Sequence, residues 1–452
     1  MPRFILFVVN TNTYFSVLFN LARRFKASSF AIHIVFDGGY PTLQHDIERC
    51  RTARLDFSIR NEYGFSNNYF IRVLQLILSR GSLGKFVKSY LQTLYDIRSI
   101  KQLLQQKQPD FIALAADNVA YSTALYIKLG HTLGIKTVVF PQWLANAKEP
   151  VEFIINDDDY EVKSVYSKLI ARFFPKWTFS VNGKTLLRLP AQKILLKELF
   201  GISPKLPWIL HSGDADRIAL ESRAMKAFSR RIGLPDEQTI VTGSLELDML
   251  CDIKKHSAIL RHKLYARYGF AKSRPLVITA LPPDFYTHTG GRPQSEFKNY
   301  RELLNKWIDA FKVNNPANLL VCVHPSVDKK NFSLAETAYM KLCREDLINV
   351  LPLGDLFVAS VSATIQWAIC VNIPTINYDV YQYDYDEYKH VAGVITVRDY
   401  HNFKTTLKHL TQRPAEIEEL RKKQSKISDM WGTLDGHSFD RIQSLIDSLD
   451  KA

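Results

Sequence analysis

Three hydroxyl side chains lie where a buried strand is expected to end and a helix to begin. Ser360, Ser362 and Thr364 fall within VASVSATIQWAICVNIPTINYD, the segment 358–379. A hydroxyl in this place can cap the helix by accepting a backbone N–H group. A turn at the carboxyl end of a strand in an α/β sheet also offers N–H groups and a helix dipole, which favour a bound phosphate. The pattern predicts a phosphate-binding turn, with helix capping as the alternative.

A histidine and a proline end another expected strand. His324 and Pro325 follow the apolar run of NLLVCVHPS, residues 318–326. The imidazole could simply be hydrogen-bonded by backbone at the strand end. One strand–helix–strand unit before Ser360 and Ser362, it could instead donate to the same phosphate, where negative charge develops on a leaving group. We expect His324 and the hydroxyl turn to act together.

Three further residues lie at or after expected strands of the same half of the chain. Thr279 belongs to PLVITALPP (275–283), an apolar strand that ends in two prolines. Asp379 and Glu387 belong to YDVYQYDYDEY (378–388), which is rich in tyrosines and acids. Carboxylates beside aromatic faces suit the hydroxyl groups of a sugar or a ribose, and a surface turn is the alternative.

The elements that must position these residues alternate between strand and helix along the chain. A first series of strands is expected at 4–10, 31–39, 110–116, 135–143, 207–213 and 239–244, and a second at 275–283, 318–326, 348–352, 356–360, 374–379 and 393–397. The helix after the third strand is expected to start at Asp117 and Asn118. Strands that alternate with helices of roughly 10–15 residues predict a parallel sheet covered on both faces.

Two such series predict an α/β protein with two Rossmann-like, doubly wound parallel-sheet domains that face a cleft. We place the first domain at 1–245, the second at 246–430 and a C-terminal helical tail at 431–452. Ligands bind at the carboxyl ends of the strands in such sheets, so the residues above would line the cleft.

The charge of the chain points to an anionic partner. The formal net charge is +14, and the stretch 163–205 carries nine Lys and Arg against one acid, Glu198, among several aromatic residues. This composition suits a nucleic acid or a membrane surface, and a solvated helix face is the plain alternative. Because no nucleic-acid-binding motif is recognisable, we expect an anionic membrane surface and no nucleic acid. The sequence contains no run of 18 apolar residues, so we predict no membrane-spanning helix.

Five scattered cysteines without a C-x-x-C pair predict reduced thiols in a cytoplasmic protein, and neither a disulfide framework nor a zinc site. The acidic run at residues 157–159 is expected to be a solvated turn, so no metal is predicted.

The second half of the chain resembles a known group of enzymes at four places. These are SRRIGLPDEQTIVTGSLELDML (229–250), the His-Pro strand end at 319–330, the hydroxyl turn in 358–379 and LDGHSFDRIQSLIDSL (434–449). They resemble segments of two-domain, B-type nucleotide-sugar glycosyltransferases of surface-polysaccharide biosynthesis, in particular CMP-sialic acid, Kdo-type and CDP-glycerol-type transferases. A more distant resemblance is to the UDP-N-acetylglucosamine 2-epimerases.

The resemblance implies a donor domain in the second half of the chain. Gly243 would permit the tight crossing between the domains, and Asp248 would cap the helix that follows. The implied donor-binding set is His324, Pro325, Ser360, Ser362, Thr364, Thr279, Gly243, Asp379 and Glu387. The donor would be CMP-, CDP- or UDP-linked and the acceptor a glycan or a lipid-linked sugar. No cofactor is implied, because the nucleotide-sugar is a substrate.

The resemblance also implies a catalytic base in the first domain, because such enzymes deprotonate the acceptor hydroxyl with an Asp, Glu or His. Asp117 and Asp37 are the best-placed acids, although Asp117 could merely cap a helix. Glu149, His211 and His288 are further candidates. The expected location is cytoplasmic, peripheral on the inner face of the membrane.

Two alternatives remain open. One is an epimerase-like isomerase, although the His-Arg-x-Glu-Asn loop and the Ser-Gly-Gly turn of those enzymes are replaced here by residues 279–285 and 360–363. The other is a non-catalytic homologue that binds a nucleotide-sugar.

Overall fold

The computed structural model describes residues 2–60, 82–117, 119–140, 149–152, 154–211, 214–288, 294–312, 317–324, 327 and 334–449. The chain divides into two compact units. Unit 1 comprises residues 1–220, 226–242 and 442–452, and unit 2 comprises residues 221–225 and 243–441. The division runs through two helices, α9 (Arg223–Arg231) and α19 (Ser438–Leu449).

Unit 1 is built on a seven-stranded parallel sheet. In spatial order the strands are β3 (Asp56–Arg60), β2 (Ala31–Asp37), β1 (Phe4–Val9), β4 (Phe111–Leu114), β5 (Lys136–Val139), β8 (Arg217–Leu220) and β9 (Thr239–Val241). In the register of β1, Phe4 lies opposite Ala31 of β2, and Ile5 opposite Phe111 of β4. β1 is buried from Ile5 onward, because helices cover both faces of a central parallel strand.

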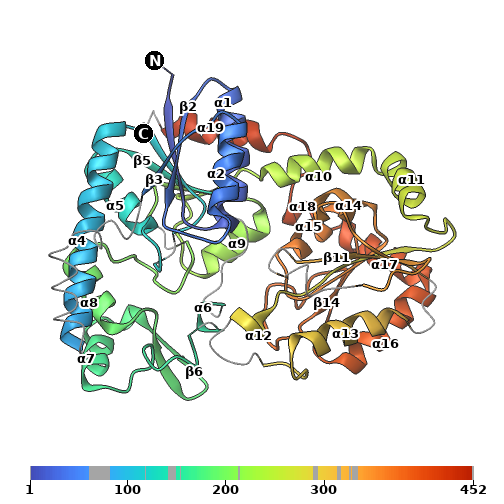
Figure 1. Cartoon of the computed structure of the whole chain (residues 1–452). Coiled ribbons are helices and arrows are strands. Elements are labelled where there is room, and N and C mark those ends of the chain that lie inside the picture. The colour runs from blue at the N-terminus through green and yellow to red at the C-terminus, as the bar shows by residue number, and fades with distance from the viewer. Residues whose placement is uncertain are drawn as a thin grey trace. The chain divides into compact units, whose positions relative to one another are not determined.

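Helices lie on both faces of this sheet (Figure 1). The described helices of unit 1 are α1 (Asn12–Ala27), α2 (Leu43–Thr52), α4 (Ser82–Lys107), α5 (Thr123–Thr132), α6 (Glu149–Glu152), α7 (Val165–Phe173) and α8 (Ala191–Leu199), with the greater part of α9. Of these, α7 packs against α8. Local chemistry sets the ends of the helices. Thr11 caps α1, for example, because its hydroxyl accepts the N–H of Tyr14 at 3.3 Å.

A small antiparallel hairpin lies in the long segment between β5 and β8. It consists of β6 (Thr178–Val181) and β7 (Lys184–Leu187), joined by Asn182 and Gly183. Both turn residues have positive φ, 49° and 75°, as the type I′ turn of a two-residue hairpin requires.

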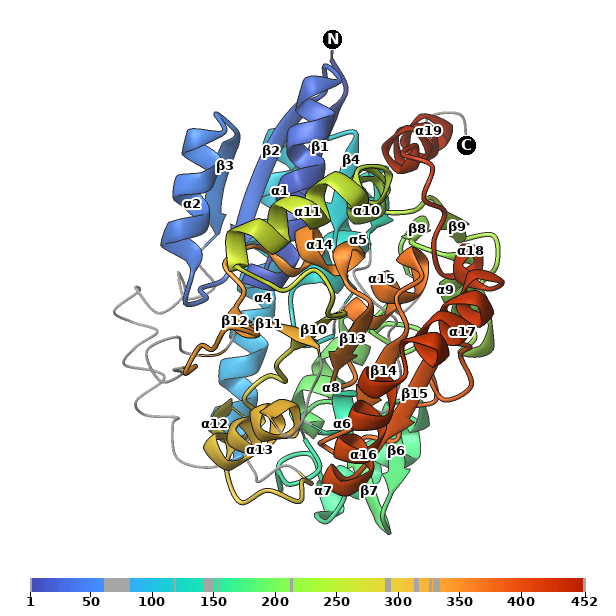
Figure 2. The same ribbon diagram turned by 90° about the vertical axis from the view of Figure 1, so that its right-hand side faces the viewer.

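Unit 2 is built on a six-stranded parallel sheet (Figure 2). In spatial order the strands are β12 (Met340–Leu342), β11 (Asn318–Cys322), β10 (Leu276–Ala280), β13 (Leu356–Ala359), β14 (Thr375–Tyr378) and β15 (Val394–Val397). β13 pairs with β10 on one side and β14 on the other. Both sheets therefore have the strand order of a Rossmann fold, and the order reverses between β1 and β4 in unit 1 and between β10 and β13 in unit 2.

Helices cover both faces of the second sheet as well (Figure 2). They are α10 (Leu245–Lys255), α11 (Ser257–Tyr268), α12 (Phe285–His288), α13 (Tyr300–Lys312), α14 (Leu347–Val350), α15 (Thr364–Val371), α16 (Tyr400–Gln412), α17 (Pro414–Ser425) and α18 (Ser428–Trp431). An aromatic stack joins helices to sheet: the ring of Tyr378 lies 5.3 Å from Trp307 and 4.5 Å from Phe403, measured between centroids.

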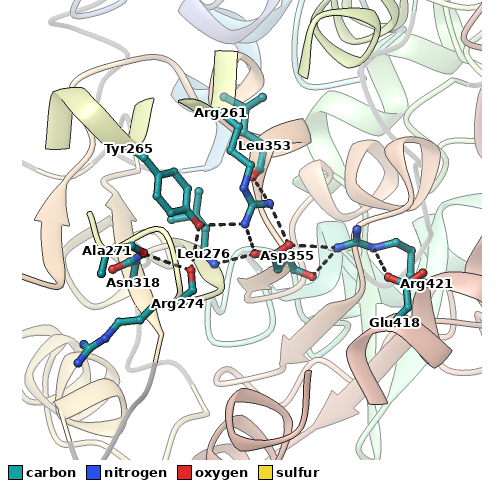
Figure 3. A network of polar contacts seen from close by, with 10 residues as sticks. All are labelled: Arg261, Tyr265, Ala271, Arg274, Leu276, Asn318, Leu353, Asp355, Glu418 and Arg421. Carbon is teal, nitrogen blue, oxygen red and sulfur yellow. Dashed lines mark hydrogen bonds and ion pairs between the residues drawn. The ribbon is translucent and has the colours of Figure 1, made fainter. Parts of the chain in front are cut away.

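A network of ionic and polar contacts fixes the amino ends of β10 and β13 (Figure 3). Arg261 on α11 donates from Nη1 to Asp355 Oδ1 at 2.9 Å, and the backbone N–H of Leu276 donates to Asp355 Oδ2 at 2.8 Å. Arg421 on α17 lies 3.5 Å from the same carboxylate. Burial by itself would raise the pKa of Asp355, but the hydrogen bonds and charge of Arg261 outweigh it and the pKa is lowered. The network ties two helices to the sheet.

Two of the segments that resemble the transferases contact each other within unit 2. The carboxylate of Asp248 on α10 accepts the N–H groups of Ser438 and Phe439 at 2.9 and 3.2 Å. Asp248 therefore caps α19 and not the helix that follows it, which corrects the expectation. Gly243 has φ +81°, and a Cβ there would lie 2.4 Å from the hydroxyl oxygen of Ser438. Gly243 therefore permits close packing against Ser438, and its assignment to the donor site stays a prediction.

Three expected elements differ from the structure. Within the strand expected at 207–213, the described residues 207–211 form no strand, because Trp208 packs against the β6–β7 hairpin, and β8 occupies this place in the sheet. The run 348–352 forms α14 and a 3₁₀ turn, since Pro352 lacks the N–H that a central strand needs. The helix after β4 starts only at Thr123.

All five cysteines are free thiols. Across the described ranges, no helix combines the length and the apolar character that crossing a bilayer requires.

Candidate functional site

The hydroxyl turn of unit 2 lies where the strand order reverses, the usual position of ligand sites in open α/β sheets. Ser360 directly follows β13 and is 8% exposed. Its hydroxyl oxygen has no hydrogen-bond partner among the described residues. Because native proteins rarely leave a buried hydroxyl unsatisfied, this atom is a candidate for contact with a ligand.

The turn holds a strained residue. Val361 has φ +41°, a left-handed conformation that costs a β-branched residue of the order of 1–3 kcal/mol. It is held there because its N–H donates to Oδ1 of Asn377, on the neighbouring strand β14, at 2.8 Å. Strain of this kind is common where a backbone is shaped for binding.

Ser362 and Thr364 lie together at the start of α15. Their hydroxyl oxygens are 2.8 Å apart, and the N–H of Thr364 donates to the hydroxyl of Ser362 at 3.3 Å. The N-cap position itself is Ala363, whose side chain makes no capping bond. The phenol of Tyr388 donates to the carbonyl of Ser362 at 3.3 Å, which ties the tyrosine-rich segment to the turn. Glu387 precedes Tyr388 and stays a predicted donor contact.

His324 follows β11 and is partly buried, and burial lowers its pKa, so the imidazole is neutral near pH 7. The strand β10 lies between β11 and β13. His324 and Ser360 therefore belong to strands two spacings apart, roughly 10 Å, and not to adjacent strands as expected. Pro325 lies outside the described residues.

Two residues predicted to bind the donor have structural roles. Thr279 is fully buried, accepts a hydrogen bond from Trp307 Nε1 at 2.9 Å and donates to the carbonyl of Val358 at 3.3 Å. Asp379 is buried, and its two carboxylate oxygens accept the N–H groups of Tyr383 and Asp384 at 2.9 and 2.8 Å. Both side chains are engaged in internal hydrogen bonds, and their contact with a donor stays a prediction.

Sequence reasoning missed a buried glutamate beside the turn. Glu221 accepts hydrogen bonds from Ser244 Oγ at 2.7 Å and from Gln366 Nε2, on α15, at 2.8 Å. Burial raises its pKa to about 8, against the opposing effect of these hydrogen bonds. Glu221 thereby joins the start of α10 to the helix behind the hydroxyl turn. The sequence signal for its burial is the apolar run Ile218–Leu220 that precedes it.

In unit 1, Asp37 is committed to a buried ion pair. Arg60, opposite it on β3, donates from Nε to Asp37 Oδ1 at 2.7 Å, and Ser122 Oγ donates to Oδ2 at 2.5 Å. Arg60 also donates to Asp96 on α4 at 2.8 Å. Asp37 therefore has a structural role in this buried ion pair, and its role as catalytic base stays a prediction.

Asp117 follows β4, next to the point where the strand order of unit 1 reverses. It forms a parallel backbone bridge with His211, and the N-cap position of the next helix, α5, is Ser122. Neither ring nitrogen of His211 has a hydrogen-bond partner in the described part of the chain, and burial lowers its pKa to about 3. Burial also lowers the pKa of Lys197 to about 8, against the attraction of the Asp117 carboxylate. Asp117 is thus joined to His211 by a backbone bridge, and its carboxylate acts electrostatically on Lys197. The side chains of Glu149 and His288 lie outside the described residues.

The acidic run 157–159 is an exposed turn in which Asp158 pairs with Lys163 at 2.9 Å. Within the residues that the structure describes, no group of three His, Cys, Asp or Glu side chains could hold a metal ion.

No protein-family model matches the chain, and no curated protein matches its sequence. Solved structures do match over almost the whole chain. The calicheamicin glycosyltransferase CalG4 aligns with TM-score 0.54, 12% identity and coverage of 99% of this chain and 98% of its own. The UDP-GlcNAc 2-epimerase from Neisseria meningitidis, bound to UDP-GlcNAc, aligns with TM-score 0.52 and 11% identity, and the alignment covers 99% of this chain and 100% of the epimerase. The wall teichoic acid polymerase TagF aligns with TM-score 0.52 and 12% identity, and the alignment covers 100% of this chain and 90% of the TagF chain.

These similarities establish the fold. The protein has the GT-B fold of two Rossmann-like α/β domains that nucleotide-sugar glycosyltransferases and 2-epimerases share, which confirms the predicted fold class.

Proposed function

We propose that the protein is a glycosyltransferase that moves a sugar from a nucleotide-activated donor, with the donor phosphates bound at the turn 360–364 of unit 2. The buried hydroxyl of Ser360 carries the proposal, because it has no partner among the described residues and lies at the reversal point of a Rossmann-ordered sheet. The strained turn and the start of α15 supply N–H groups and a dipole that favour an anion.

The spacing of the candidate residues favours a diphosphate donor. His324 and Ser360 belong to strands two spacings apart, roughly 10 Å. A UDP- or CDP-linked sugar has two phosphates to contact both groups, whereas a CMP-linked sugar has one. A neutral imidazole can donate a hydrogen bond to the leaving phosphate as the bond to the sugar breaks.

Asp117, His211 and Lys197 in unit 1 are the proposed acceptor side. Asp117 would take the proton of the acceptor hydroxyl. At the same time the hydroxyl oxygen of the acceptor would form a bond to the anomeric carbon, and the bond from that carbon to the nucleotide phosphate would break. Neutral His211 would orient that hydroxyl. Asp117 is 1% exposed, so the proposal requires local opening when the acceptor binds. No step in this scheme uses a metal ion.

We further propose a surface-polysaccharide acceptor, a glycan or a lipid-linked sugar at the cytoplasmic face of the membrane. This follows from the resemblance of the segments within 229–449 to surface-polysaccharide enzymes, and a wall teichoic acid polymerase is among the similar structures.

A nucleotide panel tests the proposal. UDP, CDP and CMP, with ADP as the control, are compared by thermal shift on the wild type and on Ser360→Ala. We expect UDP or CDP to stabilise the wild type by binding the folded state. UDP and CDP should raise the melting temperature more than CMP does, and the increase should be smaller in Ser360→Ala. Equal shifts for ADP and all three pyrimidine nucleotides would contradict a specific donor site.

An epimerase is the second candidate, because the structure from Neisseria meningitidis shares the fold. Incubation with UDP-GlcNAc in the absence of an acceptor separates the two. An epimerase inverts the configuration at C2, which NMR detects, whereas our proposal expects no C2 epimer.

A further inference from the structure

The helix α7 of unit 1 presents an apolar ridge to solvent. Val165, Leu169 and Phe173 are 78%, 47% and 70% exposed. Residues spaced by four lie on one face of a helix, so the three side chains form a continuous stripe. The opposite face is already used, because Ser167 and Ile170 are buried and Ile170 packs into an apolar cluster with Trp177. The folding of unit 1 therefore does not need this stripe.

Further exposed apolar side chains lie on neighbouring helices. α8 packs against both α7 and α4, and the three lie together in unit 1 (Figure 1). Leu199 at the end of α8 and Tyr90 and Leu94 on α4 are exposed as well. Most of the large apolar side chains that the described residues leave exposed belong to these helices. A gathering of exposed apolar side chains on neighbouring helices marks an interaction site more often than scattered single residues do.

Two cations flank the ridge and take no part in the ion pairs of the described residues. Lys168 and Arg172 alternate with the ridge residues along α7, and both are exposed, as is Lys193 on α8. The ion pairs that the described residues form in this region use other cations, Lys163, Lys176 and Lys184. The acid of the 163–205 stretch, Glu198, is paired with Lys176 at 3.1 Å.

We propose that α7 docks this protein on an anionic lipid bilayer. Val165, Leu169 and Phe173 enter the boundary between headgroups and acyl chains, while Lys168 and Arg172 contact anionic headgroups. The chemistry favours lipid over a second copy of the chain, because two such faces would bring like charges together. The surface is defined by α7, and Lys176, whose charge is already paired, lies outside it. The proposal is independent of the enzymatic activity.

Vesicle co-sedimentation tests the proposal. The purified protein is mixed with vesicles of phosphatidylcholine containing phosphatidylglycerol, or of phosphatidylcholine alone, at low and high salt. We expect binding to the anionic vesicles that weakens as salt is added. Val165→Ser/Leu169→Ser/Phe173→Ser and, separately, Lys168→Glu/Arg172→Glu should each weaken the partition coefficient at least about tenfold.

The matched control is Ile259→Ser/Lys263→Glu on α11 of unit 2, which likewise changes an exposed apolar residue and an exposed cation. It should bind vesicles as the wild type does. All variants should keep the wild-type melting temperature and nucleotide response, so a failed nucleotide site and a failed membrane site are told apart. Absence of binding at low salt, unchanged binding of both α7 variants, or a dimer that the serine variant dissociates would overturn the proposal.

Discussion

Two buried titratable residues give the protein opposite pH dependences. Burial lowers the pKa of His211 to about 3 and raises that of Glu221 to about 8. In the unfolded chain both groups titrate near their ordinary values, roughly 6.5 and 4.3. Stability must therefore change with pH wherever the folded and unfolded states bind different numbers of protons.

His211 should make the protein less stable in acid. Between pH 6.5 and 3 the unfolded state binds a proton that folded His211 refuses, so the free energy of unfolding falls as pH falls, by up to about 1.4 kcal/mol per pH unit. His211→Gln should remove that share of the slope, measured by urea unfolding at pH 7 and pH 5. His33, whose pKa burial lowers to about 4, serves as a comparison. An unchanged slope in His211→Gln would contradict the buried neutral imidazole.

Glu221 should act in the opposite direction. Its folded pKa lies above the unfolded value, so its contribution is complete below about pH 4.5 and is lost as pH rises through about 8. In Glu221→Gln the amide oxygen can still accept the hydrogen bond from Ser244 Oγ, and the side chain carries no charge. We expect the variant to equal the wild type at pH 5 and to exceed it in thermal stability at pH 8.5. A variant that is less stable than the wild type at pH 8.5 would refute a protonated Glu221.

At the scale of elements, the sequence predicts the buried strands well and the short ones poorly. β1 and β13 were expected because central parallel strands are continuous apolar runs. β3 and β12 lie at sheet edges, where exposed or polar residues interrupt the run. The strand expected at 207–213 is in fact β8 (Arg217–Leu220), one segment later. Trp208 and Ile209 are as apolar as strand residues, and only tertiary packing places Trp208 against the hairpin.

The candidate site follows the same division. The turn 360–364 was predictable because hydroxyls between a strand and a helix are visible in one segment. The ion pair of Asp37 was not, since it depends on Arg60 of β3, a strand that the sequence did not reveal. Lys197 and Glu221 likewise acquire their shifted pKa values from burial, which no local pattern encodes.

The Asp355 network yields a prediction for the elements that it joins. Asp355→Asn keeps the size of the side chain but weakens the bonds from Arg261 and Arg421, which tie α11 and α17 to the sheet (Figure 3). We expect a loss of about 2 kcal/mol in urea unfolding, because the pair is partly buried. Asp309→Asn breaks an exposed pair with Lys312 and should cost no more than about 0.5 kcal/mol. Equal losses would mean that the network has no special role.

At the scale of the whole molecule, we propose that unit 2 binds the donor and that unit 1 carries out proton transfer. Asp117→Asn should therefore lower sugar transfer at least about 100-fold, while nucleotide affinity stays close to the wild-type value. Activity is followed by nucleotide release and affinity by calorimetry. Joint loss of both, with a lower melting temperature, would mark Asp117 as structural. Full activity would move the search for the base to Lys197.

Isothermal titration calorimetry of UDP and CDP against the wild type and Ser360→Ala tests the central claim most directly. Removing an unpartnered buried hydroxyl should leave the melting temperature of the free protein unchanged or raise it. It should also weaken binding of the diphosphate about ten- to a hundredfold, through the lost hydrogen bond to a charged group. Thr411→Ala, which removes a buried hydroxyl that already donates to Leu407, should instead lower stability and leave affinity intact. Wild-type affinity in Ser360→Ala would contradict the assignment of the turn 360–364 as the phosphate site.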